Sequence, residues 1–356
     1  MEFKRKPTPA RISTGPSVAG RVTGFLGIAA VAALIFGFLE LLEYSHRFTA
    51  PETESREILV SIPQGAGYPQ IARILQDAGV IRDGAAFLWA VRINSLLKRP
   101  VSVKAGEQAL DPSLSTWETL ALLSRGNFKL YPFTVPEGWN MAEIARQAEL
   151  AGLGSAQEFL ALCRDPGYVR SLGIEAPSLE GYLFPETYSF PRGTSLRTVV
   201  KAMTDQFFKV WAKYRDQAAA RGLTMNQAVT LASIVEKETG DPAERPLIAA
   251  VFFNRLAKNM RLQTDPTVIY GIPNFDGNLT RAHLETPHPW NTYVIQGLPP
   301  GPIASPGEAA IQAAVNPAQA EYLYFVSKND GTHHFSETLR EHNRMVAQYQ
   351  RQGRGS

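Results

Sequence analysis

The paired segments SIPQGAGYPQIARILQDAG (residues 61–79) and TVPEGWNMAEIARQAELAG (residues 134–152) decide the fold of much of this chain. At an offset of 73 residues they share the Pro-x-Gly of a turn, the run Ile-Ala-Arg and a closing Ala-Gly. Each copy predicts a short strand, a turn and a helix of about ten residues that ends at glycine. Two copies are too few for a solenoid. They therefore predict two small α+β units.

The first unit, residues 57–130, continues with helix patterns over residues 85–97 and 116–124 and a strand-like run over residues 101–104. A strand, two helices and a strand is the arrangement of a LysM-like module, a fold that elsewhere binds glycan chains. This assignment is an analogy of fold and does not by itself establish binding.

A second domain is predicted over residues 131–350, with the second α+β unit (131–176) at its start. The rest of it is mainly helical, with long loops that are rich in aromatic residues, and long loops in a compact domain are usually functional. The predicted elements are helices over 196–220, 225–238, 243–258, 306–314 and 339–349 and a strand over 322–326. The fold class is therefore α+β.

The apolar stretch VTGFLGIAAVAALIFGFL (residues 22–39) has 18 residues without a charge. That length predicts a transmembrane helix over residues 21–43. Secretory signals have shorter apolar regions and a small-residue cleavage site, so we expect an uncleaved anchor. Basic residues precede the span and acidic residues follow it, which places the N-terminus in the cytoplasm and the rest of the chain outside it. Residues 1–20 and 351–356 are predicted to be disordered tails, and residues 44–56 a tether.

The overall composition excludes several other classes of protein. The 356 residues include 36 Lys and Arg against 33 Asp and Glu, with 19% charged and 44% hydrophobic residues. Wholesale disorder needs fewer apolar residues, and a nucleic-acid-binding face needs a stronger basic excess. Five basic residues and one acidic residue lie within the first 21 positions, so the small net charge of +3 comes from the tail. We expect no nucleic-acid partner.

Cysteine and histidine give no sign of a metal or cofactor site. The six histidines lack metal-ligand spacing, and neither a G-x-G-x-x-G motif nor a Walker loop is present. The adjacent His333 and His334 are interpreted as a polar turn. Cys163 is the only cysteine and lies in an apolar helical pattern, so it is predicted to be a core residue without a disulfide partner.

The segment ASIVEKETG (residues 232–240) carries the chemistry that remains. Its apolar residues recur at helical spacing, and Glu236 and Glu238 follow them at the C-terminal end. Two positions correspond to about 200° around a helix, so these carboxylates cannot share one site and only one should face a cleft. From the charge pattern alone, a solvated helix end is the more common interpretation.

Around this segment, the sequence resembles the endolytic murein transglycosylases of the YceG-like family. The resemblance covers the chain from the predicted anchor to near residue 350. It is carried by LEGYLFPETY (179–188), ASIVEKET (232–239), FxNRL (252–256), MRLQTDPTVIYG (260–271), NTY (291–293), GLPPGPIASPG (297–307) and YLYFV (322–326).

The resemblance implies non-hydrolytic cleavage of the β-1,4 bond between N-acetylmuramic acid and N-acetylglucosamine, with a 1,6-anhydro end as product. One glutamic acid with a raised pKa suffices, because the C6 hydroxyl of the same sugar replaces water as the nucleophile. Lysozyme-like transglycosylases place this acid in a Glu-Ser or Glu-Thr pair. The pair Glu238-Thr239 matches, so Glu238 is the predicted acid and Glu236 the alternative.

Other residues of the shared motifs are predicted to bind substrate or to orient the acid. Aromatic faces stack on sugar rings, while carboxylate, amide and hydroxyl groups bind sugar hydroxyls. The candidates are Glu180, Tyr182, Glu186, Gln263, Thr264, Asp265, Tyr270, Asn291 and Tyr293.

The predicted function is therefore internal cleavage of nascent peptidoglycan strands, which helps to terminate glycan elongation. The implied partners are glycan strands, the membrane through a single-pass anchor, and peptidoglycan polymerases. The expected location is the cell inner membrane, with the catalytic domain in the periplasm. Two alternatives stay open: a non-catalytic, membrane-anchored glycan-binding scaffold, and a muramidase that uses water as the acceptor.

Overall fold

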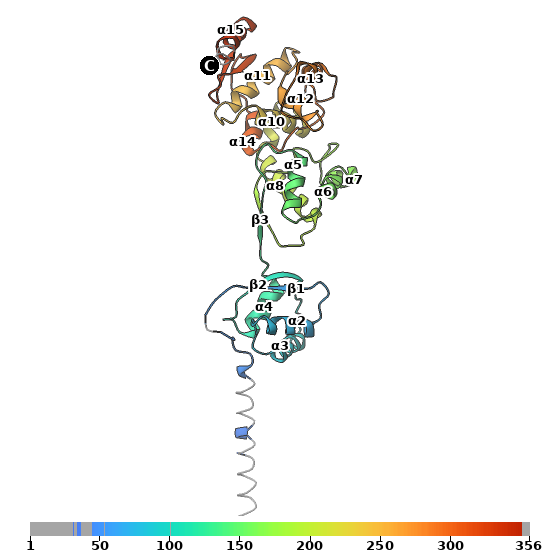
Figure 1. Ribbon diagram of the computed structural model, residues 1–356, viewed down its shortest axis with the longest axis vertical. Helices are drawn as coiled ribbons and strands as arrows, with labels where there is room; N and C mark the ends of the chain where they lie inside the picture. The colour runs from blue at the N-terminus through green and yellow to red at the C-terminus, as the bar shows by residue number, and fades with distance from the viewer. Residues whose placement is uncertain (1–30, 32–33, 37–44, 53, 100, 351–356) are drawn as a thin grey trace, which may run out of the picture. The chain divides into compact units, whose positions relative to one another are not determined.

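The computed structural model describes residues 31, 34–36, 45–52, 54–99 and 101–350, which divide into two compact units between Lys129 and Leu130 (Figure 1). Most of the predicted span at residues 21–43 lies outside the described residues, as do the predicted tails at 1–20 and 351–356. Within the described part of the chain, no helix has both the length and the apolar character needed to cross a membrane.

The first unit has the predicted order of strand, two helices, strand and helix. Its elements are β1 (Ile58–Ile62), α2 (Tyr68–Asp77), α3 (Gly84–Leu96), β2 (Gly106–Leu110) and α4 (Thr116–Arg125). The two strands pair antiparallel, with Ile58 opposite Leu110 and Ile62 opposite Gly106. Alternate residues of both strands are buried, and they form a core with α2, α3 and α4.

One strand of this unit was predicted in the wrong place. Residues 101–104 alternate like a strand because Val101 and Val103 pack against the core, but they form no ladder. The strand that pairs with β1 starts at Gly106, where Gln108 and Leu110 become the buried positions. Pairing with β1 therefore decides the position of β2, and the local alternation does not.

The second unit contains the remaining elements. They are β3 (Tyr131–Thr134), α5 (Met141–Leu150), α6 (Ala156–Cys163), α7 (Pro166–Ser171), β4 (Thr187–Phe190), α8 (Leu196–Trp211), α9 (Arg215–Ala220), α10 (Met225–Glu238), α11 (Arg245–Ala257), α12 (Asp265–Tyr270), α13 (Arg281–Glu285), α14 (Glu308–Val315), β5 (Tyr324–Ser327), β6 (His333–Ser336) and α15 (Leu339–Tyr349). The described strands of the chain form three two-stranded antiparallel sheets, β1–β2, β3–β4 and β5–β6. Together with the helices they confirm the α+β class.

Several predictions for this unit need correction. The helix predicted over 196–220 is two helices, α8 and α9, which are separated by a turn at residues 212–214 that includes the buried Tyr214. The strand predicted over 322–326 is β5, and its partner β6 occupies the place where His333 and His334 were interpreted as a turn. The two polar histidines at the start of β6 gave no strand pattern in the sequence. The buried Ser336 shows that β6 packs against the rest of the unit.

The helix α10 is the centre of the second unit. Thr224 caps its start in a reciprocal pair with Gln227, and α14, α11 and α12 pack around it. All residues from Ala228 to Val235 are buried, whereas the sequence predicted only one apolar face. The polar Ser233 is tolerated there because its hydroxyl donates to a carbonyl of the same helix and accepts the N–H of Ile303 (3.1 Å).

Both copies of the repeat form the predicted strand, turn and helix. Gly65 and Gly138 occupy the same turn position with φ of 78° and 76°, a conformation that favours glycine. The copies differ in their surroundings. A Cβ atom at Gly65 would meet open space, whereas one at Gly138 would contact the side chains of Lys237 and Glu236. The second copy therefore lies against the C-terminal end of α10.

Candidate active site

The C-terminal end of α10 holds Glu238 against the start of α12. The chain becomes extended at Thr239, which ends the helix directly after the glutamate. The hydroxyl of Thr264 donates a hydrogen bond to Oε1 of Glu238. Thr264 occupies the N-cap position of α12, yet its hydroxyl makes no capping bond to that helix. The threonine is therefore used to hold a carboxyl group.

The surroundings of Glu238 favour its protonated form. Burial raises its pKa to about 7, the nearby charge of Asp265 acts in the same direction, and the Thr264 hydrogen bond opposes both. A carboxyl group with this pKa carries a proton in a large fraction of molecules near neutral pH. It can then act as a general acid.

Glu236, two residues earlier, lies in a different environment. Its side chain is 6% exposed, Oε1 pairs with Arg245 at 2.9 Å, and Oε2 accepts the N–H of Gly307 at 3.0 Å. Burial, together with the charge of Glu137, raises the pKa of Glu236 above its ordinary value, and the N–H of Gly307 and the Arg245 charge oppose that rise only in part. Both carboxylate oxygens are thus bound within the protein, joining α10 to α11 and to the start of α14.

A cavity of about 500 Å³ opens beside Glu238, and Glu236 does not line it. Polar side chains dominate its wall near the acid, where Gln263, Asp265 and Tyr293 converge. The phenol of Tyr293 donates to Asp265 at 2.6 Å, and burial raises the pKa of that phenol. Thus four of the predicted site residues, Gln263, Thr264, Asp265 and Tyr293, lie around Glu238.

Arg255 of α11 supports this wall and was not predicted as a site residue. Its guanidinium donates to the carbonyls of Leu323, Arg261 and Leu262 at 2.7–3.1 Å and to the side chain of Gln263 at 3.2 Å. These bonds tie the segment before α12 to the segment before β5. The motif FxNRL contains this arginine, but only the folded chain shows what it binds.

Glu180 and Tyr270 line a second cavity of about 300 Å³, together with Trp290. Glu180 accepts the N–H of Met141 at 2.9 Å and the phenol O–H of Tyr270 at 3.0 Å. Burial raises the pKa of Glu180 to about 7. Tyr270 ends the short helix α12 that Thr264 and Asp265 begin. These two candidates therefore lie at the other end of the helix that contacts Glu238.

Tyr182, Glu186 and Asn291 line neither of these two cavities. Tyr182 is fully buried and packs edge-on against Phe207. Glu186 is exposed beside β4, where it accepts the N–H of its neighbour Thr187. Asn291 is 1% exposed, and its amide donates to three carbonyls of the α13 segment. The contacts of Tyr182 and Asn291 hold the fold, and those of Glu186 are local.

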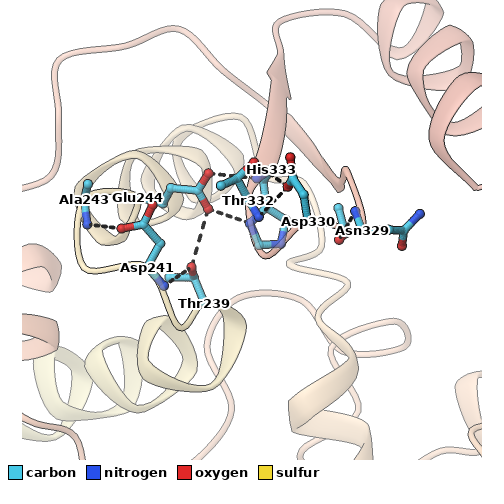
Figure 2. A network of polar contacts seen from close by, with 9 residues as sticks. Thr239, Asp241, Ala243, Glu244, Asn329, Asp330, Thr332 and His333 are labelled. Carbon is cyan, nitrogen blue, oxygen red and sulfur yellow. Dashed lines mark hydrogen bonds and ion pairs between the residues drawn. The ribbon is translucent and has the colours of Figure 1, made fainter.

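Another part of the wall of the Glu238 cavity comes from β5, β6 and α15. Sequence reasoning missed its polar residues because they lie about 90 positions or more from Glu238 and outside the motif segments. Its polar members are Ser327, His333, His342 and Gln350. His333 is held by Glu244, whose carboxylate also accepts from Thr239 (Figure 2).

No group of three or more His, Cys, Asp or Glu side chains within the described ranges could hold a metal ion. Cys163 is fully buried in the core of the second unit, which confirms the prediction for this residue. Burial raises the pKa of its thiol, so it stays protonated.

Comparisons with known proteins agree with the motifs. The YceG-like family model matches residues 60–348. A Bacillus subtilis protein named endolytic murein transglycosylase is 33% identical over 306 residues, covering 82% of this chain and 84% of its own length. A protein of the same name from Streptococcus pneumoniae is 30% identical over 82% of this chain and 58% of its own length. A crystal structure of a YceG-like protein from Listeria monocytogenes superposes with a TM-score of 0.56 at 34% identity, covering 82% of this chain and all of that one. With its motifs and its fold in agreement, this chain belongs to the YceG-like family.

Proposed function

We propose that this protein is an endolytic lytic transglycosylase, a lyase that cuts peptidoglycan strands internally. Two relatives that are 30% and 33% identical over most of the chain carry the name endolytic murein transglycosylase. The observation that carries the proposal within the structure is Glu238, a carboxyl group with a pKa of about 7 in the wall of a 500 Å³ cavity.

In the proposed reaction, protonated Glu238 donates its proton to the oxygen of the β-1,4 bond as the bond from C1 to that oxygen breaks. The C6 hydroxyl of the same N-acetylmuramic acid forms a new bond to C1, and the Glu238 carboxylate accepts the hydroxyl proton. The acid is thereby regenerated, and the product carries a 1,6-anhydro ring. Water takes no part, so a second catalytic carboxylate is not required.

The environments of the two glutamates support Glu238 over Glu236 as this acid. Glu236 pairs with Arg245 and accepts the N–H of Gly307, and it does not line the cavity where a glycosidic oxygen could reach an acid. We propose Gln263, Asp265 and Tyr293 as sugar-contacting residues of the same cavity. Thr264 orients the acid through its hydroxyl.

Glu180 and Tyr270 are proposed to act at a distance from the cut bond. Their hydrogen bond fixes the end of α12, while the start of the same helix follows the threonine that binds Glu238. Loss of this bond would loosen the helix that positions the acid. This role needs no contact between Glu180 and substrate.

For the whole chain we propose a single-pass anchor at residues 21–43 in the cell inner membrane, with both compact units in the periplasm. The apolar run of 18 uncharged residues and the basic residues before it support this topology. The LysM-like first unit is proposed to contact glycan. Peptidoglycan polymerases are the proposed partners, because nascent strands are the substrate and because cutting them would end elongation.

Mass spectrometry of cleavage products tests the function. The detergent-solubilised full chain is incubated with uncrosslinked glycan strands, and the released ends are weighed. We expect internal cuts with anhydro ends, lighter than hydrolysed ends by one water molecule. Reducing ends would instead establish a muramidase, and binding without cleavage would establish a glycan-binding scaffold.

A further inference from the structure

The carboxylate of Glu244 gathers hydrogen bonds from two separate parts of the second unit (Figure 2). It accepts the backbone N–H of His333 at 2.7 Å and faces Nδ1 of the same residue at 2.7 Å. It also accepts the hydroxyl of Thr239 at 3.4 Å. Thr239 directly follows Glu238, so this carboxylate connects the end of the catalytic helix to strand β6.

This arrangement fixes which nitrogen of His333 is free. An ionised carboxylate only accepts hydrogen bonds, so with Glu244 ionised Nδ1 must carry the hydrogen. Nε2 is then the remaining polar atom of the ring, and none of the described residues forms a hydrogen bond with it. Edge-to-face packing on Phe325, with ring centres 5.4 Å apart, restricts rotation of the imidazole.

The same imidazole lines the Glu238 cavity. The His333 side chain is 13% exposed, and the cavity wall contains it together with Glu238, Asp265 and Tyr293. A carboxylate that orients a histidine whose second nitrogen is free is an arrangement that prepares the ring to bind a ligand. If the contact between Glu244 and His333 served only to join β6 to α11, the imidazole would not need to lie at the cavity wall.

We propose that His333 is a substrate-binding residue whose Nε2 forms a hydrogen bond with a sugar hydroxyl of the glycan strand beside Glu238. Glu244 is the positioning residue. A hydroxyl fits this place because it both donates and accepts, so it can bind Nε2 of either the neutral or the protonated ring. The inference rests on the proposed function, since it takes the glycan strand as the occupant of the cavity.

The neighbouring His334 provides a matched control. It also pairs with a glutamate, Glu341, at 3.3 Å, but both side chains are more exposed, at 30% and 35%. Adjacent residues of a strand point to opposite faces, and His334 does not line the Glu238 cavity. Substitution of either histidine removes an imidazole from β6, and only His333→Ala removes one from the cavity.

Binding of uncut glycan is the direct test. In the full chain carrying Glu238→Gln, which should bind substrate with little turnover, His333→Ala should weaken the affinity for uncrosslinked glycan strands by about 3- to 10-fold, the value of one hydrogen bond. His334→Ala in the same background should leave the affinity unchanged. Thermal unfolding of each variant checks that the fold is kept.

A conservative variant separates contact from structural support. The amide of His333→Gln can reach the position of Nε2, so this variant should recover part of the affinity and of kcat/KM, whereas His333→Ala should raise KM more than it lowers kcat. Equal affinity of the His333→Ala and His334→Ala variants for glycan would overturn this inference and leave the proposed function standing. Absence of glycan binding in all variants would overturn the proposed function as well.

Discussion

The last turn of α10 presents two glutamates to two differently built regions. Between α11 and α14, Glu236 meets a guanidinium and a backbone N–H. Beside α12, the neighbours that shift the pKa of Glu238 are one hydroxyl and a second carboxylate. Burial is common to both sites, so the difference lies in what compensates the negative charge. Glu236, which holds the fold, has a cation and an N–H donor as partners. Glu238, which must carry a proton, has no cationic partner among the groups that shift its pKa.

The largest expected effect is on catalysis at the second of these sites. Glu238→Gln keeps the size of the side chain and removes the transferable proton. We expect kcat to fall by about 100- to 10,000-fold, the usual contribution of a general acid, while the free energy of unfolding in mildly acidic solution stays near that of the wild type. Release of anhydro products measures the first quantity and chemical denaturation the second. Wild-type activity in this variant would remove Glu238 from the mechanism.

The reverse outcome is expected for Glu236→Gln. Loss of the charge leaves Arg245, whose side chain is 9% exposed, with only the half-exposed Glu137 at 3.6 Å as a partner. Breaking a buried ion pair costs about 3 kcal/mol in free energy of unfolding, and the activity of the molecules that remain folded should change much less than in Glu238→Gln. Chemical denaturation and product release measure the two quantities.

The matched control for this variant is Glu308→Gln. Glu308 pairs with Lys213 at 3.0 Å, and both side chains are exposed, so the same substitution should cost less than about 1 kcal/mol. Equal costs for Glu236→Gln and Glu308→Gln would show that the Glu236 site is not more dependent on its charge than an exposed one.

The contrast between the two glutamates was only half visible in the sequence. Their spacing of two residues separates them around a helix, which predicted that one at most would face a cleft. The partners of Glu236 could not be predicted, because Gly307 lies 71 positions away and reaches it only through the packing of α14 on α10. The same holds for His333, which is 89 residues from Glu244.

Local chemistry explains which parts of the fold were predictable. Turn glycines, cap residues and helical spacing located α2, α5 and α10, because each of these signals acts within a few residues. Strand β2 was misplaced, since its position depends on pairing with β1, which lies far earlier in the chain. Tyr182 and Asn291 are sugar-binding candidates by motif membership alone, and motif membership does not separate a residue that holds a loop from one that binds substrate.

The pH dependence of activity tests whether burial sets the acid. With a pKa of about 7, Glu238 is protonated below that pH and loses its proton above it. The ratio kcat/KM should therefore fall by about tenfold for each pH unit above this value. Product release, followed over about two pH units on either side of the pKa, measures the profile. A decline that begins near pH 4.5, the ordinary value for glutamate, would contradict a desolvated acid.

The smallest expected effect concerns the hydroxyl of Thr264, which contacts Glu238 and not Glu236. Thr264→Val removes the hydrogen bond that favours ionised Glu238, so the pKa of this carboxyl should rise and the alkaline limb of the profile should move up by about 0.5 to 1 pH unit, the value of one hydrogen bond. Thr264→Ser keeps the hydroxyl and should leave the limb in place. Because the Thr264 hydroxyl does not cap α12, the shift should occur without a matching loss of stability. A downward shift would mean that Thr264 stabilises the protonated form of Glu238. The environments of Glu238 and Glu236 would then differ more than their shared burial suggests.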